Sequence, residues 1–308
     1  MKTAFIFSGQ GAQYYNMGKD LYGNFSCVRD TVEEANTVLD FDIKEICFRQ
    51  NEKLNITEYT QPAILVFSIA FFRLLTQNGI NAGYYAGLSL GEYSALTAAG
   101  AFDFKDAVQL VRKRGKFMQG AVPEGSGGMT AVMGASREII EEVCREASAD
   151  GIVAPANYNM PGQIVIAGTI KALESAENLL KGRGIRRFIR LKVSGPFHTP
   201  LLKPAADKLN SELKKINIYD MRKPVITNLT GTEIKDKSGI IDTLTKQVVS
   251  PVYWEEGINY LINKGVGCFV EVGPGKALSS FIKKINKGAI TYNIEDMQSF
   301  EEILERLG

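Results

Sequence analysis

Short apolar runs and longer segments with helical periodicity alternate along the chain. Residues 4–7 form an uninterrupted apolar run that predicts a buried strand, and the Ser-Gly-Gln-Gly segment at 8–11 predicts a turn after it. Residues 62–77 read as a helix, with Thr60 as its expected N-cap and Gly79 as its stop. Apolar residues cover most of its circumference, so we expect this helix to be buried.

The middle of the chain has a different pattern. Residues 123–128 (Pro-Glu-Gly-Ser-Gly-Gly) have the composition of a linker. After them the periodicity predicts strand, helix, strand, strand, helix and strand, over residues 129–133, 137–147, 152–156, 163–167, 171–181 and 186–193. This β-α-β-β-α-β order is that of the ferredoxin-like split βαβ unit.

Strand, loop and helix units resume towards the end of the chain, as in residues 268–272, 273–275 and 276–284. We therefore expect the α/β class, with a large α/β-hydrolase-like domain built on a parallel sheet and interrupted by a small ferredoxin-like α+β domain. The large domain is expected to comprise residues 1–123 and 194–308, and the small one residues 124–193.

Composition restricts the function classes. Of 308 residues, 45% are hydrophobic and 23% are charged, which is ordinary for a globular protein, and the net charge of +2 is too small to argue for nucleic-acid binding. Four scattered cysteines and a single histidine favour reduced thiols in the cytoplasm and no metal site. The N-terminal apolar run is too short for a signal peptide. The longest apolar stretch, residues 63–75, is interrupted by Ser68 and Arg73, so no membrane association is expected.

One motif predicts covalent chemistry. Gly87, Ser89 and Gly91 have the Gly-x-Ser-x-Gly spacing of a nucleophile elbow, in which a serine lies on a tight turn between a strand and a helix. The context fits, because residues 83–86 look like a strand and residues 92–99 like a helix that ends at Gly100. The alternative is an ordinary turn serine. A serine hydroxyl needs a base to take its proton, and His198 is the only imidazole in the chain.

Several ordered blocks, rather than the elbow alone, resemble the malonyl-CoA:acyl carrier protein transacylases of fatty acid synthesis and the related acyltransferase domains of polyketide synthases. The likeness extends over nearly the whole chain. Its blocks lie at residues 7–13 (FSGQGAQ), 60–63 (TQPA), 87–95 (GLSLGEYSA), 114–118 (RGKFM), 156–163 (ANYNMPGQ), 195–198 (GPFH), 247–254 (Gln247, Pro251 and Trp254) and 271–275 (EVGPG).

The resemblance implies transfer of a malonyl group from malonyl-CoA to the phosphopantetheine thiol of an acyl carrier protein, in a ping-pong reaction through a malonyl-serine ester. Ser89 would be the nucleophile and His198 its base, and the backbone N–H groups of Gln10 and Leu90 would form the oxyanion hole. A backbone carbonyl near Gln247 would orient the imidazole in place of a carboxylate.

The resemblance also assigns substrate recognition. Arg114 would bind the free carboxylate of the malonyl group, whereas by composition alone it is one member of a solvated charge run at residues 112–114. Phe197 matches the malonyl-preferring form of its block, and Asn157 and Asn159, expected in a turn, would border the cleft. Leu88 replaces the family's common histidine before the nucleophile, and Ser8 replaces a common proline.

No bound cofactor or metal is implied, and we expect a monomer. Six basic residues lie within twelve positions, without an acid among them, at 181, 183, 186, 187, 190 and 192. They predict either a docking surface for an acidic carrier protein or a solvated face. Two other functions stay open: a serine esterase or thioesterase that uses the same elbow, and a non-catalytic docking module for carrier proteins with a vestigial site. The position of His198, 110 residues before the C-terminus, argues against the chain order of α/β-hydrolases.

Overall fold

The computed structural model describes residues 1–308 and contains two five-stranded sheets. The first sheet has the order β10-β9-β1-β2-β7, and all of its strands are parallel. Phe7 pairs with both Gly87 and Val272, so the carboxyl ends of three central strands are level with one another. The loops after these strands therefore gather at one edge, where ligands bind in open α/β sheets. The strands are β1 (Lys2–Phe7), β2 (Tyr84–Gly87), β7 (Val225–Ile226), β9 (Val266–Val272) and β10 (Ile290–Ile294).

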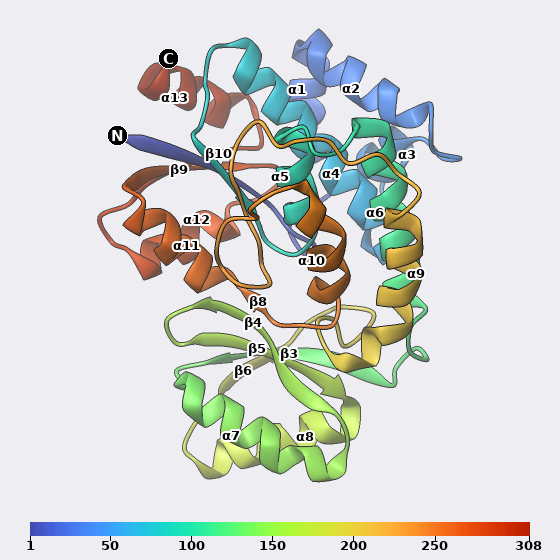
Figure 1. The fold of residues 1–308 in the computed structure, drawn as a ribbon, viewed down its shortest axis with the longest axis vertical. Coiled ribbons are helices and arrows are strands. Elements are labelled where there is room, and N and C mark those ends of the chain that lie inside the picture. The colour runs from blue at the N-terminus through green and yellow to red at the C-terminus, as the bar shows by residue number, and fades with distance from the viewer.

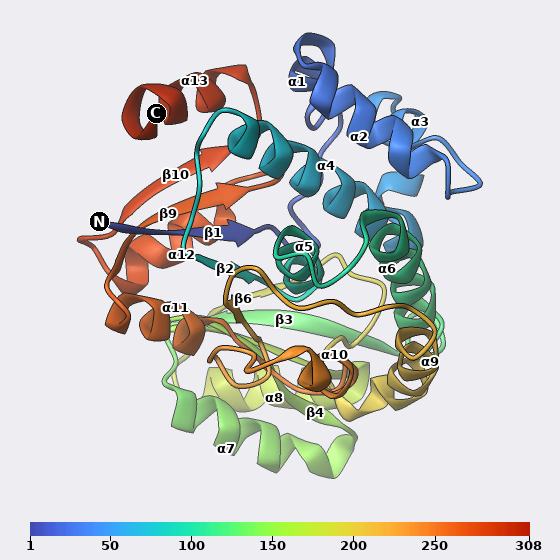
Figure 2. The ribbon, with the colours of Figure 1, turned by 45° about the horizontal axis from the view of Figure 1, so that its top comes forward.

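Strand alternation divides β1 between two hydrophobic clusters. Phe5 and Phe7 belong to the large cluster that contains α4, whereas Ala4 and Ile6 pack with two C-terminal helices, α11 (Trp254–Asn263) and α12 (Ala277–Ile285). Figure 2 shows the helices on both sides of this sheet. The helices that contribute to the large cluster are α1 (Lys19–Asn24), α2 (Ser26–Asn36), α3 (Ile43–Phe48), α4 (Thr57–Gln77), α5 (Leu90–Ala98), α6 (Phe104–Gln119), α9 (Lys203–Leu213), α10 (Ile240–Gln247) and α13 (Met297–Leu307).

Helix α4 is buried as the sequence predicts, but it begins five residues earlier than expected. Its N-cap is Ile56, and Thr60 lies inside the helix, where its hydroxyl donates to the carbonyls of Leu54 and Ile56. At 21 residues, α4 is long and apolar enough to cross a membrane, yet 78% of its most apolar window is buried in the protein. Such a helix is explained by its place in the core.

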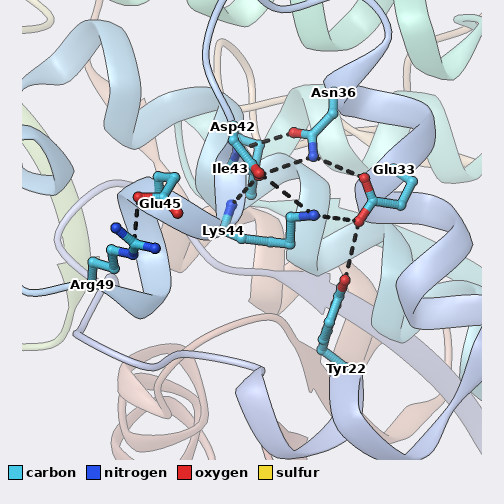
Figure 3. Close-up of polar contacts among 8 residues, drawn as sticks. All are labelled: Tyr22, Glu33, Asn36, Asp42, Ile43, Lys44, Glu45 and Arg49. Atoms are coloured by element: carbon cyan, nitrogen blue, oxygen red, sulfur yellow. Dashed lines mark hydrogen bonds and ion pairs between the residues drawn. The ribbon is translucent and has the colours of Figure 1, made fainter.

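A polar cluster joins α2 to α3 in the outer helical layer (Figure 3). Asp42 caps α3 by accepting the backbone N–H of Lys44 at 2.8 Å. Asn36 at the end of α2 donates to Asp42 Oδ1 at 3.0 Å and accepts the N–H of Ile43 at 3.0 Å. The ammonium of Lys44 then bonds to Glu33 at 2.7 Å. These contacts fix the turn between two helices that both pack on α4.

The second sheet has the order β6-β3-β5-β4-β8 and is antiparallel except for the pairing of β4 with β8. One face packs on α7 (Arg137–Ala147) and α8 (Ile170–Gly182), which lie at the bottom of Figure 1. Met129 and Ala131, on the other face, join the large cluster. The strands are β3 (Gly127–Met133), β4 (Val153–Met160), β5 (Gln163–Thr169), β6 (Arg187–Arg190) and β8 (Val252–Tyr253).

Strand β4 is longer than the sequence predicts. It continues to Met160, so Asn157 and Asn159 are strand residues, and the expectation that they lie in a turn is wrong. The turn is Pro161-Gly162, with Gly162 at a φ of 75°. The pairing of β4 with β5 shifts register between Pro155 and Asn157 and again before Met160. Bulges of this kind turn side chains towards one face, and they hid the strand's alternation in the sequence.

Candidate active site

Ser89 lies on a strained turn between β2 and α5, with φ 53° and ψ −100°. Both flanking glycines are required by contact. A Cβ on Gly87 would lie 2.0 Å from the carbonyl carbon of Gly91, and a Cβ on Gly91 would lie 2.1 Å from the carbonyl oxygen of Phe7. The turn therefore passes directly over the end of β1, and the side chain of Ser89 is held above the edge of the sheet.

The hydroxyl of Ser89 is hydrogen-bonded to the chain's one imidazole. Ser89 Oγ and His198 Nε2 are 2.8 Å apart, and His198 Nδ1 lies 2.8 Å from the backbone carbonyl oxygen of Gln247. A carbonyl can only accept, so Nδ1 carries the ring proton and Nε2 offers a lone pair to the serine. His198 is itself held at a φ of 62°. The pair has the geometry of a nucleophile with its general base.

The environment keeps His198 neutral. Burial of the imidazole, together with the nearby positive charge of Arg114, lowers the pKa of His198 from 6.5 to about 4. At neutral pH the ring is thus deprotonated and ready to accept a proton. No carboxylate bonds to Nδ1, and the backbone carbonyl of Gln247 takes the place of a carboxylate in orienting the ring.

Arg114, on α6, is 1% exposed and turns inward, unlike its neighbours in the charge run. Its guanidinium donates to Gln61 Oε1 at 2.9 Å, to Gln247 Oε1 at 3.0 Å and to Ser89 Oγ at 3.1 Å. The group lies 5.0 Å above the ring of Tyr93. All of its acceptors are uncharged. A buried guanidinium without a bound carboxylate, next to a serine hydroxyl, is suited to receive a carboxylate from a ligand.

Gln247 links the three groups from the end of α10. Its backbone carbonyl accepts from His198, and its side-chain oxygen accepts from Arg114. The amide nitrogen donates to Glu92 Oε2 at 2.7 Å and to the carbonyl of Ser89 at 3.0 Å. The sequence resemblance implies a role for the Gln247 backbone alone. The roles of its side chain were not foreseen.

Asn228, which follows β7, was missed by sequence reasoning. Its side-chain oxygen accepts the backbone N–H of Ser89 at 2.5 Å, and its amide donates to the carbonyl of Gly87 at 2.7 Å. Its own backbone N–H donates to Glu92 Oε2 at 3.0 Å. This side chain therefore brackets the elbow on both sides of the strained residue. Its position after a parallel strand was the available signal, but β7 has only two residues.

The two expected oxyanion donors lie at neighbouring strand ends. Leu90 is the first residue of α5, so its backbone N–H has no partner within the helix. Gln10 lies in the loop after β1, and its backbone N–H makes no hydrogen bond to the protein. The side chain of Gln10 donates to Thr57 Oγ1 at 3.1 Å, which fixes the loop. Both residues follow parallel strands whose ends are level.

A cavity of about 550 Å³ opens over these residues between the two sheets. Ser89, Arg114 and His198 line it from the side of the parallel sheet. Phe197, Asn157 and Asn159 line it as well, each less than 9% exposed. Asn159 Oδ1 is buried without a partner. The structure contains no cluster of three or more side chains suited to hold a metal ion.

The six basic residues between positions 181 and 192 have different surroundings in the structure. Arg183 pairs with Glu146 at 2.5 Å, and Arg190 pairs with Glu177 at 2.7 Å. Arg186 and Arg187 are exposed and make no ion pair, and Lys192 lines the cavity. Of the cations in this segment, only Lys192 lines the cavity, so the docking interpretation and the solvated-face interpretation both stay open.

Comparison with known proteins defines the class. Residues 4–299 match the family model of the acyl transferase domain, and the chain belongs to this family. It is 44% identical over 308 residues to a malonyl CoA-acyl carrier protein transacylase of Bacillus subtilis, with 99% of this chain and 97% of the relative covered. A crystal structure of the same enzyme from Clostridium perfringens superposes with a TM-score of 0.97 at 47% identity, covering 100% of this chain and 97% of the other. A malonyl-transacylase solved in complex with a type II PKS acyl-carrier protein gives a TM-score of 0.96 at 40% identity, with 99% of each chain covered.

These relatives confirm the resemblance drawn from the sequence blocks. They also confirm an α/β fold with a parallel sheet and flanking helices.

Proposed function

We propose that this chain transfers the malonyl group of malonyl-CoA to the phosphopantetheine thiol of an acyl carrier protein. The observation that carries the proposal is the convergence on one serine hydroxyl of a neutral imidazole at 2.8 Å and a buried guanidinium at 3.1 Å. The transacylases among its relatives support the same substrates. No bound cofactor takes part, because the group transferred and both thiols come from the substrates.

In the first half-reaction, Ser89 Oγ attacks the thioester carbonyl while His198 Nε2 takes the hydroxyl proton. The tetrahedral oxyanion is bound by the backbone N–H groups of Gln10 and Leu90, each contributing about 3–4 kcal/mol to the transition state. The C–S bond then breaks, and the imidazolium returns the proton to the CoA sulfur. The products are free CoA and a malonyl-Ser89 ester.

The second half-reaction runs the same steps in reverse with a new thiol. His198 takes the proton of the phosphopantetheine thiol, whose sulfur attacks the ester carbonyl. The C–O bond of the ester breaks, and Ser89 regains its proton. Gln247 keeps the imidazole in one tautomer through both halves, and Phe197, Asn157 and Asn159 shape the cleft in which the acyl group and the pantetheine arm lie.

Arg114 selects the diacid. Malonyl differs from acetyl by a terminal carboxylate, and the guanidinium offers paired donors to it. We expect Arg114→Ala to lower malonyl transfer by about 2–5 kcal/mol of transition-state stabilisation, a loss of roughly 30-fold or more. Acetyl transfer should fall much less. Arg112→Ala is the matched control, because this neighbour on α6 pairs instead with Asp40 and Glu58.

The test of the whole proposal is intact mass after exposure to malonyl-CoA, followed by addition of holo acyl carrier protein. An adduct of one malonyl group that is absent in Ser89→Ala and passes to the carrier supports transfer. An adduct lost to water before the carrier is added would identify an esterase. No adduct at all would identify a docking module. Equal losses of malonyl and acetyl transfer in Arg114→Ala would remove the carboxylate assignment.

We further infer the domain division. Residues 1–123 and 194–308 form an α/β-hydrolase-like domain, and residues 124–193 form a ferredoxin-like insertion. The order β6-β3-β5-β4, with both helices on one face, supports the second name. Because β8 from the larger part pairs with β4, the two parts share one sheet edge. The proposed setting is the cytoplasm, and the proposed state is a monomer.

A further inference from the structure

A carboxylate is buried behind the site without a cation in contact with it. Glu92, on α5, is 0% exposed and forms no ion pair. Its Oε2 accepts from the Gln247 amide at 2.7 Å and from the backbone N–H of Asn228 at 3.0 Å, while Oε1 has no partner. Burial raises the pKa of the Glu92 carboxyl group, whereas its hydrogen bonds from Asn228 and Gln247 and the positive charge of Arg114 favour the ionised form. Removing an ionised carboxylate from water is costly unless an opposite charge lies near.

The cation that matches Glu92 is Arg114, which likewise has no oppositely charged group in direct contact. It is 1% exposed, all of its hydrogen-bond acceptors are uncharged, and its Nε has no partner. One side chain separates the two ions. The amide of Gln247 presents its oxygen to Arg114 at 3.0 Å and its nitrogen to Glu92 at 2.7 Å. The amide dipole is thus aligned between carboxylate and guanidinium.

We propose that Glu92 is the internal counter-charge of Arg114, acting through the Gln247 amide, and that it sets how tightly the site holds a substrate's free carboxylate. The inference rests on the proposed function, since it assumes that Arg114 receives that carboxylate. Before a substrate binds, Glu92 and Arg114 balance each other across the amide. An incoming carboxylate gains a direct contact with the guanidinium, but it also meets the field of a fixed negative charge.

The physical consequence is that the site binds a carboxylate less tightly than Arg114 would without Glu92. A buried guanidinium with no internal counter-charge would bind any carboxylate strongly, because burial strengthens charge interactions. Such binding would favour the resting complex as much as the transition state, which does not raise turnover. Glu92 prevents this excess, and it is therefore a specificity-determining and positioning residue, not a catalytic one.

Glu92→Gln tests the charge alone. A glutamine can keep the same shape and can still accept both hydrogen bonds through its oxygen, so the amide of Gln247 stays in place. We expect the concentration of malonyl-CoA that half-saturates Ser89 acylation to fall at least fivefold. Competitive inhibition by free malonate should tighten by a similar factor. The corresponding value for acetyl-CoA should change less than twofold, because acetyl carries no carboxylate.

A thermal-unfolding cycle provides a second measurement that does not depend on activity. Glu92→Gln and Arg114→Ala each leave one buried charge alone, so each should lower Tm, while the double variant should recover part of the loss. Glu34→Gln, which breaks an ion pair with Arg73 at 2.6 Å, is the control for loss of a carboxylate elsewhere. If Glu92→Gln alone fails to fold, a folded double variant still reports the coupling.

The results separate this inference from the proposed function. Equal changes for malonyl-CoA and acetyl-CoA in Glu92→Gln, or additive Tm losses in the cycle, would overturn the counter-charge role. If Arg114→Ala keeps the preference for malonyl over acetyl, the carboxylate site itself is wrong and the inference fails with it. Loss of that preference in Arg114→Ala, together with selective tightening in Glu92→Gln, supports both.

Discussion

We expect Asn228→Ala to leave the Ser89 side chain less firmly positioned. The preference between malonyl-CoA and acetyl-CoA should not change. The side chain accepts the N–H of Ser89 at 2.5 Å and donates to the carbonyl of Gly87 at 2.7 Å, so alanine leaves two backbone groups at the elbow unpaired. Asn228 is 3% exposed, and water has poor access to replace either bond. Each unpaired buried group costs about 1–3 kcal/mol, which gives about 2–6 kcal/mol for the pair.

The strain at Ser89 adds to this argument. A residue other than glycine at a φ of 53° stores about 1–3 kcal/mol, and it persists only where its surroundings hold it. With Asn228 shortened, the turn can relax and carry Ser89 Oγ away from His198. We therefore expect acylation of Ser89 to fall at least tenfold, by the same factor for malonyl-CoA and acetyl-CoA. Of the three hydrogen-bond partners of Arg114, the change affects only Ser89, and Gln61 and Gln247 stay in place.

Two assays decide the outcome. Thermal unfolding should show a Tm lower by about 4–12 °C, taking about 2 °C per kcal/mol for a chain of this size. Single-turnover acylation, followed by intact mass, should show the equal loss for both acyl groups. Asn210→Ala is the control, because that amide bonds to Thr245 between two helices outside the elbow. A variant with lowered Tm but undiminished acylation would refute the claim that Asn228 holds the nucleophile in place.

Two further outcomes follow from the site. Because the pKa of His198 is lowered to about 4, Ser89 acylation should stay level from pH 7 down to about pH 5, and a fall centred near 6.5 would contradict the buried neutral imidazole. The unfolded chain binds the extra proton between pH 6.5 and 4, so acidification through this window should destabilise the protein by up to about 3 kcal/mol relative to His198→Gln, measured as the difference in unfolding free energy. Gly91→Ala should cost about 3 kcal/mol or more and abolish acylation, since its Cβ would lie 2.1 Å from a backbone oxygen. Gly23→Ala, with open space around the new Cβ, should leave Tm unchanged or raised, and an equal Tm for both variants would refute the contact argument.

The sequence predicts best those elements that are long enough for a repeating pattern of apolar residues to show. The helix at residues 137–147 is present with the predicted bounds. Strands β7 and β8 have two residues each, too few for any alternation to show, so the chain segments that carry Asn228 and join the two sheets gave no pattern. The bulged β4 is longer than the sequence predicts for a related reason, since a register shift interrupts the period of two.

The site residues likewise differ in how far the sequence could predict them. Ser89 is marked by a local motif, and His198 by being the only imidazole in the chain. The groups that position them come from far along the chain, with Asn228 139 positions from Ser89 and Gln247 158 positions from it. A carboxylate such as Glu92 looks in the sequence like an ordinary acid in the first turn of a helix. Only the packing shows that it is buried and that an amide connects it to a cation.

The charges of Arg114, His198 and the substrate carboxylate influence one another. The positive charge of Arg114 contributes to lowering the pKa of His198, which keeps the base neutral but also makes it a weaker proton acceptor. A substrate carboxylate on Arg114 would offset that charge, and it would therefore raise the pKa of His198 while the base takes the proton from Ser89. An acetyl group lacks the carboxylate and cannot have this effect. The same guanidinium would then select the diacid twice, once by binding it and once by strengthening the base only in its presence.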